Sequence, residues 1–137
     1  MFDPMLPYSY KDHQDMNEDV AAWKHFVPSG TILGPMTVEE IFFFDKCPMC
    51  FTCKDSFGYR YLAVLHDRQE ETDIFLFVRI SHDRYGELKV GGMDLRTAFQ
   101  RPEDKVWLFR MSYPSDEVME LDVPIPDQFL PKEGVHI

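Results

Sequence analysis

The residues best suited to chemistry are three cysteines that lie close together in the segment CPMCFTC, at positions 47, 50 and 53. They form two overlapping CxxC pairs, and thiolates at that spacing can bind one Zn²⁺ ion. A closed zinc site needs a fourth ligand, and His66 would reach the cysteines across a hairpin. The sequence therefore offers Cys47, Cys50, Cys53 and His66 as a candidate metal site, with zinc as its cofactor.

Strand geometry argues against that site and favours three buried, idle thiols. Side chains alternate between the two faces of a strand, so Cys47 and Cys53 would share a face while Cys50 points away. A ferredoxin-type iron–sulfur cluster needs a further cysteine near the position that Phe57 occupies. Redox chemistry at Cys47 and Cys50 needs a helix N-terminus to lower a thiol pKa, and a turn follows this segment instead. Zinc binding and thiol chemistry remain as alternatives to idle cysteines.

Other catalytic patterns are missing from the sequence. It contains no nucleophile elbow, no phosphate-binding loop and no HExxH motif. The His-Asp dipeptides at His66 and His82 lack the further ligands that a metal phosphohydrolase needs. Paired carboxylates lie in polar runs such as Glu70-Glu71 and Asp116-Glu117, and carboxylates exposed to solvent make poor acids at neutral pH. The sequence favours a protein that is not an enzyme.

The charge of the chain points to the kind of partner. It has 24 acidic and 14 basic residues, a net charge of −10, and residues 115–137 alone contribute −5. This charge repels nucleic-acid phosphates and anionic membranes, so we expect neither as a partner. A protein with a basic surface is the natural complement, and solubility alone is the plain alternative. The candidate binding residues are Asp116, Glu117, Glu120 and Asp122, with Arg96 as a separate anion ligand.

The hydrophobic pattern predicts an α+β fold with an antiparallel sheet of about five to six strands and two or three short helices. Short turns between successive apolar runs favour a meander. The segment 37–45 also fits a helical capping box, but its β-branched and aromatic residues favour a strand. Strands are expected at 37–45, 49–54, 59–65, 74–80, 105–111 and 117–123, and helices at 15–25, 81–88 and 95–100. The nearly unbroken apolar run at 74–80 suits a central strand covered on both faces, the alternation at 117–123 suits an edge strand, and the polar stretch at 68–71 suits a turn.

We interpret residues 1–137 as one domain, because its length and its 15% aromatic content suit a single core. Residues 1–30 form an N-terminal arm with a short helix, 31–123 form the core, and 124–137 form an extended acidic tail. No apolar run approaches the length of a membrane span, and no secretory signal is recognisable, so we expect a cytoplasmic protein.

A resemblance covers about residues 37–110. An aromatic strand contains Asp45 and Pro48, and a turn follows at Gly58. The next strand contains Tyr-Leu-Ala at positions 61–63, and an aliphatic strand after it ends at Ser81. The segment Gly-Met-Asp-Leu-Arg then opens a helix at positions 92–96. This pattern resembles a bacterial domain family of unknown function. The resemblance implies a small α+β fold and no established activity. The CxxC spacing and the acidic tail lie outside the pattern.

Within the helix-opening motif, Asp94 suits a helix cap and Arg96 suits a structural brace to a nearby carboxylate. Binding of a ligand anion by Arg96 is the alternative. For the whole chain we expect a non-catalytic, acidic protein-binding module, of the inhibitor or immunity type found in bacterial and phage conflict systems; that comparison is an analogy. A homodimeric structural protein and the cysteine site are the alternatives.

Overall fold

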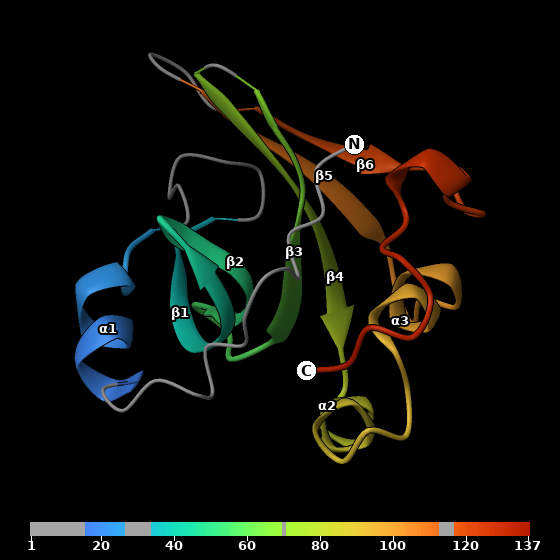
Figure 1. The fold of residues 1–137 in the computed structure, drawn as a ribbon, viewed down its shortest axis with the longest axis horizontal. Helices are drawn as coiled ribbons and strands as arrows, with labels where there is room; N and C mark the ends of the chain where they lie inside the picture. Colours follow the sequence, from blue (N-terminus) through green and yellow to red (C-terminus); the bar gives the residue numbers. More distant parts are fainter. Residues whose placement is uncertain (1–15, 27–33, 70, 113–116) are drawn as a thin grey trace.

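A computed structural model describes residues 16–26, 34–69, 71–112 and 117–137 of the chain (Figure 1). It confirms the expected α+β class. Six strands form one antiparallel sheet in which the spatial order of the strands equals their order in the sequence. The strands are β1 (Met36–Asp45), β2 (Cys47–Asp55), β3 (Arg60–Gln69), β4 (Thr72–Ile80), β5 (Val106–Ser112) and β6 (Glu117–Leu121).

The first expected strand is confirmed over its helical alternative, since β1 pairs along its length with β2. A larger difference concerns the polar stretch that begins at Arg68, which we expected to be a turn. Arg68 and Gln69 instead continue β3, after a bulge between Leu65 and Asp67. Arg68 lies opposite Asp73 on β4, and its Nε is 3.4 Å from Asp73 Oδ1. A cross-strand pair of opposite charges explains why this polar segment still extends the hairpin.

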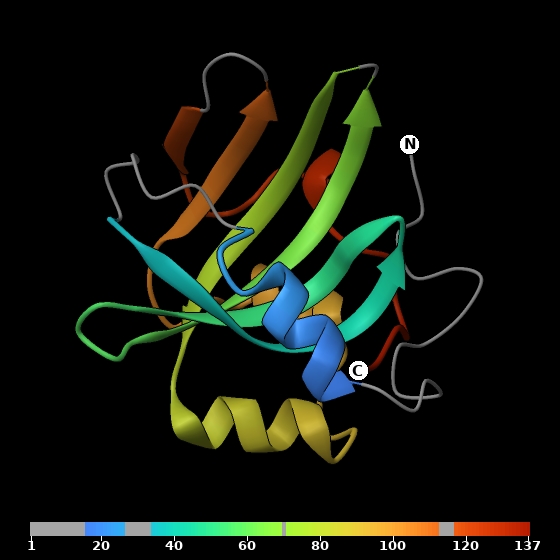
Figure 2. The same cartoon turned by 90° about the vertical axis from the view of Figure 1, so that its left-hand side faces the viewer.

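Helices cover both sides of the sheet. Helix α1 (Met16–Trp23) lies on one side, next to β1, and α3 (Leu95–Gln100) lies on the other, while α2 (His82–Lys89) lies beside the end of β4 (Figures 1 and 2). The Ser81 side chain caps α2 by accepting from the backbone N–H of Arg84. No helix in the described parts of the chain is long and apolar enough to cross a membrane.

An aromatic cluster fills the core on the α1 side of the sheet. Phe26, which follows α1, packs edge-on against Phe51 and Phe75, with ring centroids 5.9 Å apart in both pairs. Phe77 and Phe109 stack face to face across β4 and β5, with centroids 4.1 Å apart. These rings belong to a central sheet covered on both faces, as the nearly unbroken apolar run of β4 predicted.

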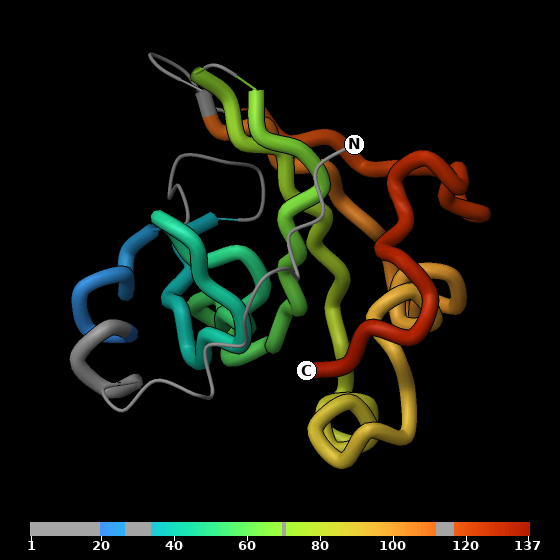
Figure 3. Tube along the Cα trace, in the orientation of Figure 1, coloured from blue at the N-terminus to red at the C-terminus, as the bar shows by residue number. Residues whose placement is uncertain are grey.

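The C-terminal segment from residue 124 runs back past α3, as the red end of the tube in Figure 3 shows. It contains one 3₁₀ turn, Asp127–Phe129, and three of its apolar side chains are buried. These are Ile125, Leu130 and Ile137. The acidic residues of this segment therefore alternate with apolar anchors that belong to the core.

Candidate functional site

The three cysteines do not come together. In the β2–β3 ladder Cys50 lies opposite Val64 and Cys53 opposite Tyr61, so these two cysteines occupy opposite faces of the sheet. Cys47 begins β2, directly after the tight turn at Lys46. His66 packs on the ring of Phe129, with centroids 5.0 Å apart. Among the described residues, no group of three or more His, Cys, Asp or Glu side chains is placed to share a metal ion.

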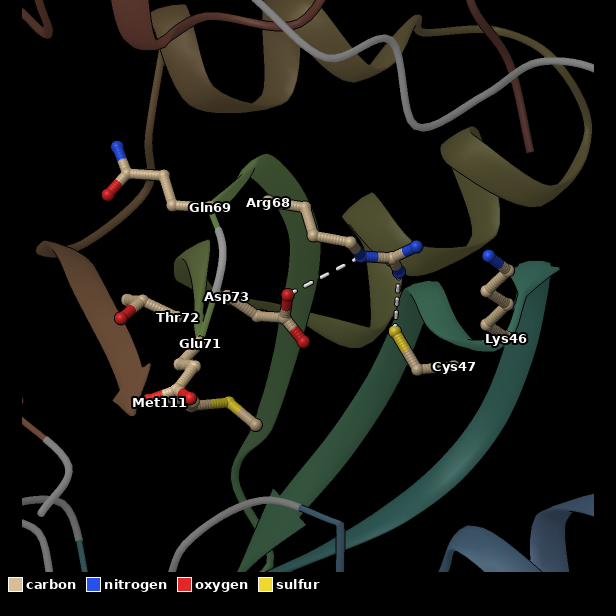
Figure 4. A pocket seen from close by; sticks show the side chains of 8 residues that line it. All are labelled: Lys46, Cys47, Arg68, Gln69, Glu71, Thr72, Asp73 and Met111. Atoms are coloured by element: carbon tan, nitrogen blue, oxygen red, sulfur yellow. Dashed lines mark hydrogen bonds and ion pairs between the residues drawn. The ribbon is translucent and has the colours of Figure 1, made fainter. Parts of the chain in front are cut away.

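Cys47 is the cysteine that borders open space. It lines a pocket of about 320 Å³ at the ends of the β1–β2 and β3–β4 hairpins (Figure 4). Arg68 lies between two partners there, since its Nη2 donates to Cys47 Sγ at 2.8 Å and its Nε faces Asp73. The same Nη2 also donates to the backbone oxygen of Asp45 at 3.2 Å. The Arg68 guanidinium therefore connects the two hairpins, and its partners are groups of this chain.

The thiols are poorly suited to nucleophilic chemistry. Burial raises the pKa of Cys47, and the neighbouring Arg68 only partly opposes that effect. Burial also raises the pKa of Cys53, whose S–H points to Met36 Sδ at 3.5 Å. A thiol that stays protonated at neutral pH is neither a good nucleophile nor a ready metal ligand. The geometry thus favours the idle-thiol interpretation over the zinc and redox alternatives.

Reaction with a small thiol reagent tests this interpretation. In the native protein we expect Cys47, at 8% exposure, to be labelled first and slowly, and faster as the pH rises. Cys50 and Cys53 are fully buried and should react only after denaturation. Mass spectrometry of labelled peptides measures each site, and Cys47→Ser is the control that removes native labelling. Added zinc should change nothing; protection of all three thiols by zinc would contradict the interpretation.

The acidic candidates gather at the free edge of the sheet. Glu117 and Glu120 lie on β6, Asp122 follows directly, and all three are exposed. Asp116 lies outside the described residues. Among the described strands, β6 pairs with β5 alone, so its outer edge has no strand beside it. The acidic candidates in the described chain thus line one strand edge.

Two basic residues lie one strand further in. Lys105, just before β5, places its Nζ 3.5 Å from Glu120 Oε1, and Arg110 lies opposite Glu117 in the β5–β6 ladder. The Lys105 and Glu120 side chains are each about half exposed, so their ion pair contributes little to the stability of the fold and leaves the carboxylate accessible to a partner. A molecule that approaches β6 from outside meets the carboxylates before the cations.

Two apolar residues at this edge escaped the sequence analysis. Met119 and Val123 are each 56% exposed. Met119 also lines a shallow depression of about 190 Å³ together with Leu108 and Arg110. Strand alternation places both residues on the face of Leu121, and the position of β6 at the end of the described sheet leaves them accessible. Single exposed apolar side chains are common on protein surfaces, so Met119 and Val123 supply apolar contact area at this edge but do not by themselves mark a site.

Arg96 makes the contacts of a structural brace. Its guanidinium donates to the backbone oxygen of Pro131 at 3.0 Å and pairs with Asp127 at 3.2 Å. Asp94 caps α3 by accepting from the N–H of Thr97 at 2.8 Å, and its other oxygen accepts from the N–H of Gly134. Asp94 and Arg96 therefore both attach the C-terminal segment to α3. The Arg96 guanidinium already has partners within this chain.

The turn expected at Gly58 connects β2 to β3, and it carries another exposed apolar side chain. Phe57 is 86% exposed at its tip. The turn is held by Asp55, whose Oδ1 accepts from the backbone N–H of Phe57 at 2.9 Å and of Tyr59 at 3.0 Å. Gly58 adopts a φ of 88°, which a residue with a side chain would resist. The turn therefore displays an aromatic ring on a fixed backbone.

Comparisons with known proteins give a family and nothing beyond it. A family model matches residues 24–137, and its description is a family of unknown function, DUF6575. No curated protein matches the chain, and no solved structure matches it. The match includes the whole described sheet and the C-terminal segment, which are the parts of the chain that carry the acidic edge.

Proposed function

Because this chain belongs to DUF6575, a family of unknown function, we propose its function from its surface: it is a non-catalytic, acidic module that binds a basic protein through the β6 edge. The observation that carries the proposal is the placement of Glu117, Glu120 and Asp122 on the outermost strand, with the neighbouring cations one strand inside. Opposite fields of this kind accelerate encounter and select partners by charge.

The narrower form of the proposal is an inhibitor or immunity-type partner in a bacterial or phage conflict system. The net charge of −10 supports it, because such a protein needs a complementary surface and no active site. Burial raises the pKa of Cys47 and of Cys53, and this supports the non-catalytic part of the proposal. The homodimer alternative has less support at this edge, since the strand from Glu117 to Leu121 contains no basic residue with which a second copy could pair.

A charge-reversal comparison tests the acidic edge. The variant Glu117→Lys, Glu120→Lys, Asp122→Lys should lower the capture of a basic partner from a lysate of the source organism on the order of tenfold or more, because like charges then face each other. Quantitative mass spectrometry of the captured proteins, with wild type at low and high salt, measures the loss. High salt should weaken capture by the wild type, since exposed charges are screened.

A matched variant separates this edge from net charge alone. Glu71→Lys, Glu87→Lys, Glu133→Lys changes the charge by the same amount at exposed positions elsewhere on the chain. We expect it to keep the partner. If the edge variant retains every protein that the wild type captures, or if both variants lose the partner equally, the acidic edge is not the binding site.

A further inference from the structure

The outer edge of β6, which no other described strand pairs, offers a partner more than charge. An edge strand presents backbone groups that no strand has paired, and another chain can bind by adding a strand there. Resting on the function proposed above, we propose that the partner binds as an extended segment that pairs antiparallel with β6 and extends the sheet by one strand. Every described ladder of this sheet is antiparallel, so the added strand continues the same arrangement.

The side chains of β6 define what such a segment must carry. Glu117, Met119 and Leu121 share one face of the strand, and Val118 and Glu120 share the other. In an antiparallel pair, residues directly opposite each other lie on the same face and interact. Each carboxylate therefore selects a basic residue across from it, and each apolar side chain selects an apolar residue.

Antiparallel pairing with β6 sets the order in which the partner segment must present these residues. Read from its N-terminus, the added segment passes Leu121 first and Glu117 last, and Asp122 precedes this run just outside the strand. The pattern is basic, apolar, basic, apolar, apolar, basic. The basic residues meet Asp122, Glu120 and Glu117. The shallow depression beside Met119 receives the apolar residue opposite it.

A second copy of this chain does not satisfy the pattern. The six residues from Glu117 to Asp122 include three acids and no base, so no register between two copies of β6 brings a carboxylate against a cation. Acidic residues on an edge strand thus reject a strand of the same charge while they accept a basic one. The same three carboxylates account for both effects.

Synthetic peptides test the strand addition directly. The matched probe carries Lys-Val-Lys-Val-Val-Lys between short Gly-Ser ends. The inverted probe places its apolar residues first and its basic residues last, as Val-Val-Val-Lys-Lys-Lys, with equal composition and charge, so that no register pairs all three carboxylates with lysines. Fluorescence anisotropy with the full chain measures both affinities. We expect the matched probe to bind on the order of tenfold more tightly than the inverted one, and the variant Glu117→Lys, Glu120→Lys, Asp122→Lys to bind neither.

Methylation of the peptide backbone distinguishes strand addition from simple charge attraction, because it removes backbone hydrogen bonds and leaves the side-chain charges unchanged. Two versions of the matched probe are N-methylated on alternate amides, one on each edge of the added strand. Because only one set of amides faces β6, one version should lose binding and the other should keep it.

If matched and inverted probes bind alike, or if both methylated versions bind like the parent, strand addition is wrong and the attraction is one of charge alone. If no probe binds, strand addition is likewise wrong. In each case the capture experiment with the edge variant decides separately whether the acidic edge binds a partner.

Discussion

Replacing Phe77 with alanine should lower the free energy of unfolding by about 3–5 kcal/mol, the usual cost of removing a buried aromatic ring. Phe77 is fully buried on the central strand β4. Its ring stacks on Phe109 and meets the edge of Phe51, with centroids 6.0 Å apart. Neighbours from three strands cannot all move inward to fill the space, so a cavity remains. Urea denaturation followed by tryptophan fluorescence measures the change.

The matched control is the same substitution at Phe57. That side chain is 86% exposed and its turn is held by backbone contacts to Asp55, so Phe57→Ala should change the unfolding free energy by less than about 0.5 kcal/mol. If Phe77→Ala yields no folded protein, Phe77→Leu should give a smaller, measurable loss. Equal effects of Phe77→Ala and Phe57→Ala would contradict the described packing of the sheet.

The second large effect concerns Glu39 on β1. Its carboxylate accepts from Arg60 Nε at 2.7 Å and from Arg60 Nη2 at 2.9 Å. Thr52, whose side chain is fully buried, donates to it at 3.0 Å, and Lys54 lies 3.2 Å away. The hydrogen bonds from Arg60 lower the pKa of Glu39 to about 2, although burial opposes the shift. One carboxylate thus joins three strands of the sheet.

The lowered pKa sets the sign of the pH dependence. A depressed carboxyl pKa stabilises the folded state at pH values above the ordinary pKa of the group, and that contribution is lost as the pH falls toward about 2. Glu39→Gln should therefore cost about 2 kcal/mol at neutral pH. The difference between wild type and variant should shrink as the pH falls from about 4.5 to about 2.

Denaturation curves at a series of pH values check this prediction. Glu87→Gln is the control, because Glu87 lies exposed on α2 and its replacement should change little at any pH. A constant difference between wild type and Glu39→Gln across the whole pH range would show that the cost comes from lost packing and not from the ionised carboxylate.

Local signals explain why much of the fold could be predicted from the sequence. Asp94 directly precedes the helix expected at 95–100, and an aspartate at that position predicts the cap that the structure confirms. The alternation of strand side chains likewise predicts that Cys50 and Cys53 lie on opposite faces. Both inferences use only neighbours in sequence, whose relative positions the helix or strand period determines.

Contacts between distant segments could not be predicted in this way. The second bond of Asp94 reaches Gly134, forty residues further along the chain. Arg68 was assigned to a turn, because the sequence does not reveal the bulge that brings it opposite Asp73 and next to Cys47. For the candidate edge, the sequence predicted both the acidic residues and the edge position of the strand, which the strand order confirms, but it did not predict the exposure of Met119.

In the binding mode proposed here, the position of β6 at the end of the described sheet separates the residues that would bind a partner from those that stabilise the fold. Of its residues, only Val118 and Leu121 pack against the core, whereas Glu117, Met119 and Glu120 face solvent. Substitutions at these exposed positions leave no cavity, so they should change the surface of the strand while the same core persists. The strand is also a natural starting point for engineering, since a library confined to those positions varies specificity on a constant scaffold.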